Sequence, residues 1–192
     1  AYVYERNADG WLPQFTALGT GFDDEFGTAV AVSSDGNTLA VGAPMKDGPT
    51  GAAYVFARSG VIWSPQASVA ASNAGAGDQF GYSVAVSGDG NTLAVGALFE
   101  DSSSTGIGST PNESAVDAGA VYVYTRSAGI WSQHTYVKAS NTGVGDRFGD
   151  SVALSSDGNA LAVGAIGEAS STTGIGSTPN ELARDAGAVY LY

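Results

Sequence analysis

The side chains best suited to chemistry lie in two nearly identical acidic segments, residues 99–117 and 167–185. Carboxylate, amide and backbone carbonyl oxygens are the ligands that Ca²⁺ prefers, and calcium takes about six to eight of them. The candidate ligands are Glu100, Asp101, Asn112, Glu113 and Asp117 in the first segment and Glu168, Asn180, Glu181 and Asp185 in the second. Carbonyls of Gly106 or Gly108 could complete the first set. The sequence therefore offers calcium as a candidate cofactor and no other.

A solvated polar loop is the alternative for these segments. Asx turns and side-chain bonds from Ser and Thr close such loops without a metal. Ala169 in the second segment stands where the first has Asp101, so this carboxylate at least is dispensable.

The residue types present give little support for a catalytic site. The chain has no cysteine and one histidine, His134, which excludes a thiol nucleophile, a Ser-His-Asp triad and a multi-histidine metal site. Asp24, Asp78 and Asp146 each precede Phe-Gly, and their recurrence favours a structural role in binding backbone N–H groups over a ring of catalytic carboxylates. We therefore expect no enzyme, and a hydrolase or lyase ranks last among the hypotheses.

The charge balance limits the partners. Nineteen acidic residues face seven basic ones, giving a net charge of −12. Such a surface repels nucleic acid and anionic membranes. No apolar run reaches the roughly 18 to 20 residues of a membrane span, so we expect no membrane insertion.

A repeated unit must position these side chains. Residues 24–43, 78–97 and 146–165 are close copies, each running from Asp-x-Phe-Gly through an Asp-Gly-Asn turn to a Leu-Ala-Val-Gly-Ala strand. Asp-Gly between apolar runs is a strong hairpin signal. A Gly-Ala-x-Tyr strand and a Trp-containing strand follow. Each unit therefore predicts four short antiparallel strands and no helix, which is typical of an all-β propeller blade.

One Arg and one Trp recur per unit, as Arg6 and Trp11 and their counterparts. Aromatic faces can stack on sugar rings, so these residues could form a glycan platform. Regular placement in every unit favours packing between neighbouring blades instead.

The combination of Phe-Gly, Leu-Ala-Val-Gly-Ala-Pro at 39–44 and Gly-Ala-x-Tyr-Val-Phe or Tyr resembles the FG-GAP repeat, the blade unit of integrin-alpha-like propellers and of many bacterial extracellular proteins. The resemblance implies a β-propeller of about seven blades, located outside the cell or on its surface, that serves adhesion and not catalysis. The calcium loop of integrin-type blades is shortened here to residues 33–38. Asp35 alone remains of its carboxylates, so that metal site is not carried over.

The strand pattern also predicts how the array is divided. Residues 1–22 end a preceding blade, 23–76 and 77–144 form two blades, and 145–192 form an incomplete one. Three periods close a ring poorly, so we expect either a part of a larger propeller, which we favour, or chains that complement one another. The expected function is recognition of a protein or glycan, with self-assembly into an extracellular fibre or surface layer as the alternative.

Overall fold

The computed structural model describes residues 1–192 except 20, 173, 175, 177 and 181, and the described part consists of antiparallel strands and their connections. The N-terminal hairpin pairs β1 (Tyr2–Asn7) with β2 (Gly10–Thr16). Blade 1 contains β3 (Val30–Val32), β4 (Thr38–Ala43), β5 (Ala52–Ser59) and β6 (Ile62–Val69). Blade 2 contains β7 (Phe80–Val86), β8 (Thr92–Ala97), β9 (Ala120–Ser127) and β10 (Ile130–Val137). Blade 3 contains β11 (Phe148–Leu154), β12 (Leu161–Ala165) and β13 (Ala188–Leu191).

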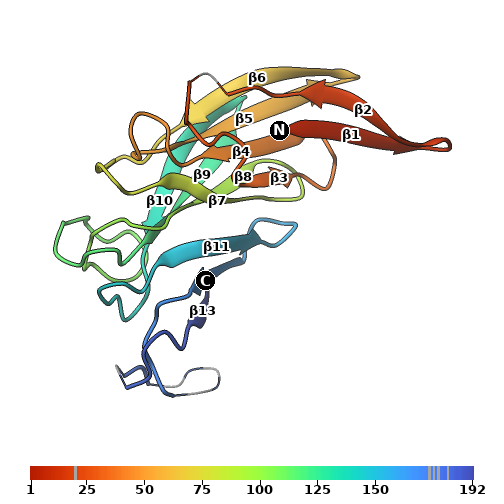
Figure 1. Ribbon diagram of the computed structural model, residues 1–192. Coiled ribbons are helices and arrows are strands. Elements are labelled where there is room, and N and C mark those ends of the chain that lie inside the picture. Colours follow the sequence, from red (N-terminus) through yellow and green to blue (C-terminus); the bar gives the residue numbers. More distant parts are fainter. Residues whose placement is uncertain (20, 173, 175, 177, 181) are drawn as a thin grey trace.

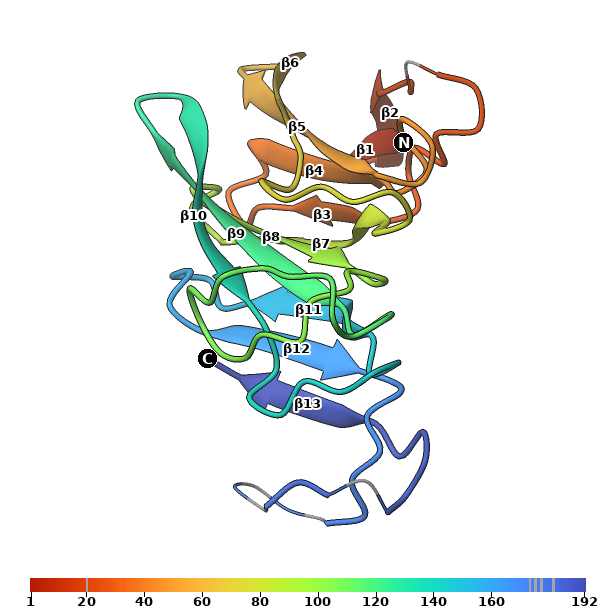
Figure 2. The same cartoon turned by 90° about the vertical axis from the view of Figure 1, so that its left-hand side faces the viewer.

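Strand order within each sheet follows the chain, as the repeat pattern predicts. Blades 1 and 2 run β3-β4-β5-β6 and β7-β8-β9-β10, and blade 3 runs β11-β12-β13. The four-stranded antiparallel unit expected from the sequence is therefore confirmed. Figures 1 and 2 show the sheets stacked in chain order, with the N-terminal hairpin at one end and β13 at the other.

The Asp-Gly-Asn turns join the first two strands of every blade. In blade 1, Asp35 Oδ1 accepts hydrogen bonds from the Ser33 hydroxyl and from the Asn37 N–H at 2.9 Å. The Ser33 hydroxyl oxygen in turn accepts the Thr38 N–H at 2.9 Å. The turn thus satisfies its own polar groups, and the same bonds recur around Asp89 and Asp157.

The first strand of blade 1 is shorter than predicted. The pattern predicts a strand from Phe26, whereas β3 begins at Val30. In blade 2, Phe80 forms a parallel bridge to Gly51 of the preceding blade, and β7 begins there. The first strands of blades 2 and 3 begin earlier because Phe80 and Phe148 pair with Ala97 and Ala165 of the second strand, whereas the described pairing of β3 begins only at Val30.

The core lies between the sheets. Phe80 and Leu93 of blade 2 pack on Val55 of blade 1, and all three are almost fully buried. The same joint recurs between blades 2 and 3, where Phe148 packs on Val121 and Val163. Burying a phenylalanine side chain contributes about 1.5–3 kcal/mol, so Phe80 and Phe148 are main sources of adhesion between blades.

Close backbone contact between blades explains the glycine in the Leu-Ala-Val-Gly-Ala strand of blades 1 and 2. A Cβ on Gly96 of β8 would lie 2.2 Å from the Gly149 carbonyl oxygen of blade 3. Gly42 of β4 meets the Gly81 carbonyl of blade 2 in the same way, at 1.9 Å. Adjacent blades therefore approach closely enough that one glycine in blade 1 and one in blade 2 have no room for a side chain.

Candidate functional site

The two acidic segments are the connections between the second and third strands of blades 2 and 3. We call residues 99–117 the first insertion and residues 167–185 the second insertion. Blade 1 has the short connection 44–50 at the same place. Each connection bonds to the start of the following repeat where one is present. Phe80 N–H donates to Thr50 O at 3.1 Å, and Phe148 N–H to Ala118 O at 2.9 Å.

A buried carboxylate organises the first insertion. Glu100 is 1% exposed and accepts hydrogen bonds from Asn73 Nδ2 at 3.0 Å and from Ser102 N at 3.0 Å. The Ser102 hydroxyl donates a further bond to the same carboxylate. Lys138 Nζ lies 3.0 Å from Glu100 Oε2. We call these four residues the Glu100 network.

Lys138 is the cation of this network and is itself fully buried. Its ammonium also donates to the Gly119 carbonyl at 2.5 Å. Burial lowers the pKa of Lys138 from its ordinary value, and the facing Glu100 carboxylate opposes that shift. Because each charge lies against the other, neither is left uncompensated in the interior.

The network ties two blades together. Tyr122 of β9 donates its hydroxyl to Asn73 Oδ1 at 2.7 Å, and Asn73 lies in the connection from blade 1 to blade 2. Burial raises the pKa of Tyr122 far above its ordinary value, so the phenol stays a donor. The chain Tyr122–Asn73–Glu100 therefore fixes the inter-blade connection to the insertion.

The first insertion also lies along the outer edge of β10. Gly108 N–H donates to Tyr136 O at 2.8 Å, and Lys138 N–H donates to Gly106 O at 3.0 Å. Ile107 forms an antiparallel bridge to Val137. The end of β10 is consequently held between β9 on one side and the insertion on the other.

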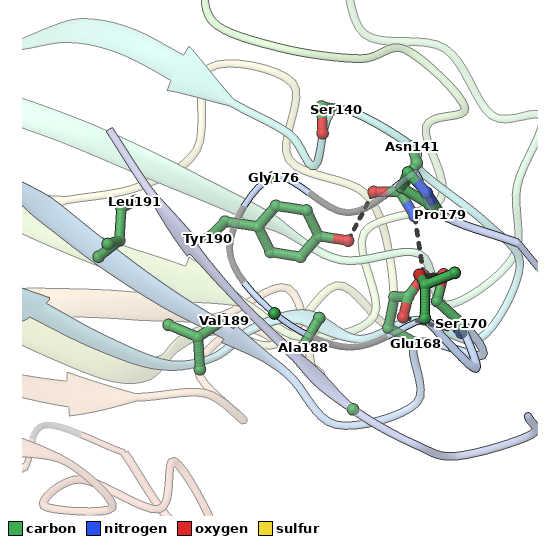
Figure 3. Close-up of a pocket in the computed structure, with 13 residues that line it drawn as sticks. Ser140, Asn141, Glu168, Ser170, Gly176, Pro179, Ala188, Val189, Tyr190 and Leu191 are labelled. Carbon is green, nitrogen blue, oxygen red and sulfur yellow. Dashed lines mark hydrogen bonds between the residues drawn. The ribbon is translucent and has the colours of Figure 1, made fainter.

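Blade 3 repeats the acidic half of this arrangement (Figure 3). Glu168 is 2% exposed and accepts hydrogen bonds from Asn141 Nδ2 at 2.8 Å and from Ser170 N at 2.9 Å. Tyr190 donates to Asn141 Oδ1 at 2.6 Å, as Tyr122 does to Asn73. We call Glu168, Asn141 and Ser170 the Glu168 network. Among the described residues, no lysine or arginine forms an ion pair with Glu168.

A groove with a volume of about 630 Å³ lies beside β13. Its lining includes Glu168 and Ser170 of the second insertion and Val189 and Tyr190 of β13. The same place in blade 2 is where the end of β10 lies.

The other proposed calcium ligands of the first insertion bond to backbone. Asp101 Oδ1 accepts the Asp117 N–H at 2.8 Å. Asn112 Oδ1 accepts N–H groups of Ser103 and Ser114, both at 3.1 Å. These are the Asx-type bonds of the alternative interpretation. The remaining candidate here, Glu113, is exposed.

In the second insertion, Asn180 Oδ1 repeats the bonds of Asn112, accepting Ser171 N at 3.0 Å and Leu182 N at 3.1 Å. Asp185 is exposed, and Glu181 lies outside the described residues. Within the described part of the chain, no three histidine or acidic side chains gather into a group that could hold a metal. Calcium binding by these loops stays a prediction.

The Asp before each Phe-Gly pair is buried and bonded to backbone in blades 2 and 3. Asp78 Oδ2 accepts the Gly75 N–H at 2.8 Å, and Asp146 Oδ2 accepts the Gly143 N–H at 2.6 Å. Asp24 is likewise buried, in the connection that precedes blade 1. Burial raises the pKa of Asp78 to about 6, and the Gly75 N–H opposes the rise. The recurrent Asp side chains of blades 2 and 3 thus have the structural bonds that recurrence indicates.

Two of the three Trp residues pack between neighbouring sheets. Trp63 is buried against Phe15 of the hairpin, with ring centroids 6.1 Å apart. Trp131 Nε1 donates to Gln66 Oε1 of blade 1 at 2.8 Å. The recurrent Arg lies over the Trp ring in both blades, whereas Trp11 is exposed.

Sequence reasoning missed Lys138. A signal was present, because Lys138 aligns with Ala70 in blade 1, the blade with the short connection. The lysine and the long acidic insertion thus occur together in blade 2, and both are missing from blade 1.

The comparisons with known proteins agree with the repeat pattern. The profile of the FG-GAP repeat matches residues 14–56, 63–124 and 131–192. No curated protein matches the chain. The described residues include no helix long and apolar enough to cross a membrane.

Two solved structures show limited similarity. Hydrazine synthase of Kuenenia stuttgartiensis aligns with a TM-score of 0.45 and 16% identity, over 81% of this chain and 34% of that one. TolB from Acinetobacter baumannii aligns with a TM-score of 0.39 and 15% identity, over 85% of this chain and 29% of that one. The chain thus spans about a third of each of those chains. Because the profile covers most of the sequence in three consecutive repeats, the chain belongs to the FG-GAP repeat family.

Proposed function

We propose that the chain is a non-enzymatic recognition module of an extracellular or cell-surface protein, and that it binds a protein or glycan ligand through its two insertions. The observation that carries the proposal is the set of hydrogen bonds that close these long connections among their described residues. Long loops with a fixed conformation, carried on a rigid scaffold, are a common location of binding function.

Both insertions are closed by the same bonds. Asn112 N–H donates to the Ser102 hydroxyl and Asn180 N–H to the Ser170 hydroxyl, both at 2.8 Å. The backbone N–H of Ala115 donates to Asp101 O at 2.6 Å. A loop that is already ordered loses little conformational entropy when it binds, which favours a recognition role.

The titratable groups with shifted pKa values support a non-catalytic role. Lys138 is engaged by Glu100, and Asp78 is engaged by a backbone N–H. Catalytic sites use such shifted groups on a substrate, whereas these two are committed to holding the fold.

Shortening the insertions tests the proposal. The variant replaces residues 98–118 and 166–186 with the sequence of the blade 1 connection, 44–50, and carries Lys138→Ala to match Ala70. Circular dichroism and thermal unfolding first establish that it folds. Both proteins are then applied to an array of immobilised glycans and matrix proteins.

We expect the natural chain to bind one class of immobilised ligand and the folded loop-shortened variant to lose that binding. A variant that carries Lys138→Ala and Glu100→Ala but keeps both insertions separates loss of the loops from loss of the ion pair. Equal binding by the natural and loop-shortened proteins would refute the proposed role of the insertions.

Self-assembly into a fibre or surface layer is the second candidate. It is favoured by apolar side chains exposed on both terminal sheets, among them Tyr2 (73%) and Trp11 (68%) on the hairpin and Val189 (72%) and Leu191 (74%) on β13. Exposed strands with apolar faces invite pairing between chains. Sedimentation velocity over a hundredfold concentration range tests it. Concentration-dependent polymers that Leu191→Lys suppresses support assembly, and a constant monomer mass argues against it.

A further inference from the structure

Blade 2 buries an amine beside a carboxylate. Lys138 and Glu100 are both almost fully buried, and Lys138 Nζ donates to Glu100 Oε2 at 3.0 Å. A lysine amine attacks carbonyl carbons once it has lost a proton, and a neighbouring carboxylate can accept that proton. Burial lowers the pKa of Lys138, which favours the neutral amine. The pair therefore has the parts of an activated nucleophile as well as those of an ion pair.

The same carboxylate holds a group that such an amine can attack. Glu100 Oε1, the other oxygen, accepts a hydrogen bond from Asn73 Nδ2 at 3.0 Å. Asn73 thereby presents a carboxamide whose nitrogen can leave as ammonia. The amine of Lys138 and the carboxamide of Asn73 are thus bound to the two oxygens of one side chain. This arrangement supplies the proximity that makes an intramolecular reaction fast.

Tyr122 provides a donor at the carboxamide oxygen. Its hydroxyl donates to Asn73 Oδ1 at 2.7 Å. That oxygen gains negative charge when an amine adds to the carboxamide carbon, and a donor already in place stabilises the charge. Burial raises the pKa of Tyr122 far above its ordinary value, so the phenol keeps its proton. Asn73 consequently has a donor on its oxygen and an acceptor on its nitrogen.

We propose that Lys138 and Asn73 join in an amide bond between their side chains, with Glu100 as the base and Tyr122 as the donor to the oxyanion. The bond from Nζ to the Asn73 carboxamide carbon forms, and the bond from that carbon to Nδ2 breaks. Glu100 carries two protons in turn from Nζ to Nδ2, so the nitrogen leaves as ammonium and Glu100 returns to a carboxylate. The reaction occurs once per chain and consumes no other reactant.

The bond encloses the whole of blade 2. Asn73 precedes β7, the first strand of that blade, and Lys138 directly follows β10, the last. A link between residues so far apart in the chain restricts the unfolded state and thereby stabilises the folded one. Blade 2 becomes a closed covalent ring whose ends stay together when its hydrogen bonds are lost.

Blade 1 cannot form this bond. Lys46 stands at the position of Glu100, and Ala70 at the position of Lys138. Blade 1 thus has neither the base nor the nucleophile, although it folds into the same four strands. The three groups in blade 2 are therefore not a requirement of the blade fold.

Mass spectrometry of the full chain tests the proposal. The folded chain is denatured and weighed intact, and we expect a mass lower than that of the sequence by one molecule of ammonia. Trypsin cleaves after lysine and arginine, so the unlinked chain yields residues 59–126 and separate peptides on either side of Lys138. We expect the linked chain to yield residues 59–126 joined to residues 127–147, with no cleavage after Lys138.

Variants assign the parts of the reaction. Asn73→Ala and Glu100→Ala should keep the full mass of their sequences. Asn141→Ala is the matched control, because Asn141 makes the equivalent bonds in blade 3, and this variant should still lose ammonia. Tyr122→Phe should slow the reaction by about a hundredfold, the usual cost of removing one oxyanion donor. Its rate is measured on chain that is isolated unfolded from inclusion bodies and then refolded.

Three results would overturn the proposal. The first is a folded natural chain with the full mass of its sequence. The second is loss of ammonia with unlinked tryptic peptides, which indicates an asparagine that has cyclised on its own backbone. The third is loss of one water, which indicates an amide between Lys138 and Glu100. All three are read from the natural chain, so they decide the question even if a variant fails to fold. None depends on ligand binding, so this inference and the proposed recognition function can fail separately.

Discussion

Blades 2 and 3 contain nearly the same insertion, yet within the described residues a cation lies beside the buried carboxylate of blade 2 and none beside that of blade 3. Glu100 and Glu168 have the same amide and serine partners. The lysine beside Glu100 comes from the end of β10, 38 residues further along the chain. The difference teaches that the insertion carries an incomplete site, and that the fourth strand of a blade completes it.

The largest effect should come from removing the cation of blade 2. Lys138→Met leaves Glu100 buried without its partner, which typically destabilises a protein by about 3–5 kcal/mol. Urea unfolding measures the loss. Lys46→Met is the matched control, because the Lys46–Asp47 pair lies at the surface and should contribute almost nothing. A Lys138→Met midpoint as close to the natural one as that of the control would contradict the importance of the pair.

Separate substitution of Glu100 and Glu168 should show that the two carboxylates contribute differently to stability. Glu100→Gln strands the Lys138 ammonium and should destabilise by about 3 kcal/mol or more. Glu168→Gln keeps the oxygen that accepts from Asn141 but loses the acceptor of the Ser170 N–H. It strands no charge, so its cost should be smaller, about 1–3 kcal/mol. Thermal unfolding of both variants decides the point. Equal losses would show that the two networks do not differ in the way the ion pair implies.

Glycine substitution compares the two blades at their joints. Gly96→Ala places a methyl group against the Gly149 carbonyl of the next blade and should cost about 1–3 kcal/mol as overpacking. In Gly164→Ala, the nearest atom is the Ser151 hydroxyl at 2.4 Å, and no following blade is packed there in the described residues. This hydroxyl can rotate away, so the cost should be smaller. A reversed order in chemical denaturation would count against the close approach of blades 2 and 3.

The burial of Asp78 should also give a pH effect. Because the pKa of Asp78 is raised to about 6, the unfolded chain ionises this group first as the pH rises from about 4. Asp78 therefore contributes a loss of stability between about pH 4 and pH 6 that levels off above its folded pKa. Asp78→Asn should remove this part of the slope of the unfolding midpoint against pH. An unchanged slope would show that a group other than Asp78 causes the loss of stability in this pH range.

The smallest effect should come from calcium. The oxygens of Asp101 and Asn112 accept protein N–H groups, and Glu100 faces an ammonium. We therefore expect excess calcium or a chelator to shift the melting temperature less than any of the substitutions above. A calcium-dependent rise that the double variant Glu113→Gln and Asp117→Asn abolishes would support the calcium site suggested by the sequence.

The fold was predictable from the sequence because the pattern of the four-stranded unit recurs along the chain. The Asp-Gly-Asn turns and the strands around them are local features, and each recurs in every blade. The late start of β3 was not predictable, because Phe80 and Phe148 pair with the second strand of their own blades, whereas the described pairing of β3 begins only at Val30 although the sequence motif is the same.

The site was harder to foresee. Glu100 lies in a segment rich in serine and acidic residues, a composition typical of a solvated loop. Its side chain is nevertheless almost fully buried. Its burial comes from contacts with the Asn73 amide and the Ser102 backbone, and Glu168 is as buried among the equivalent groups with no fourth strand in the described part of its blade. Local composition contains no information on these contacts. Comparing blade 1 with blade 2 was the available signal, because Ala70 and the short connection change together to Lys138 and the long one.

The glycine joints have an evolutionary consequence. Gly42 meets Gly81, and Gly96 meets Gly149, in the same geometry, so each blade offers its successor the same docking surface. A gene duplication that copies one whole repeat in frame therefore adds a blade without any need for compensating mutations at the new junction. A duplication of part of a repeat would instead place side chains where only glycine fits. Selection should accordingly favour gain and loss of DNA in whole-repeat steps, and the near identity of the two insertions is consistent with a recent step of this kind.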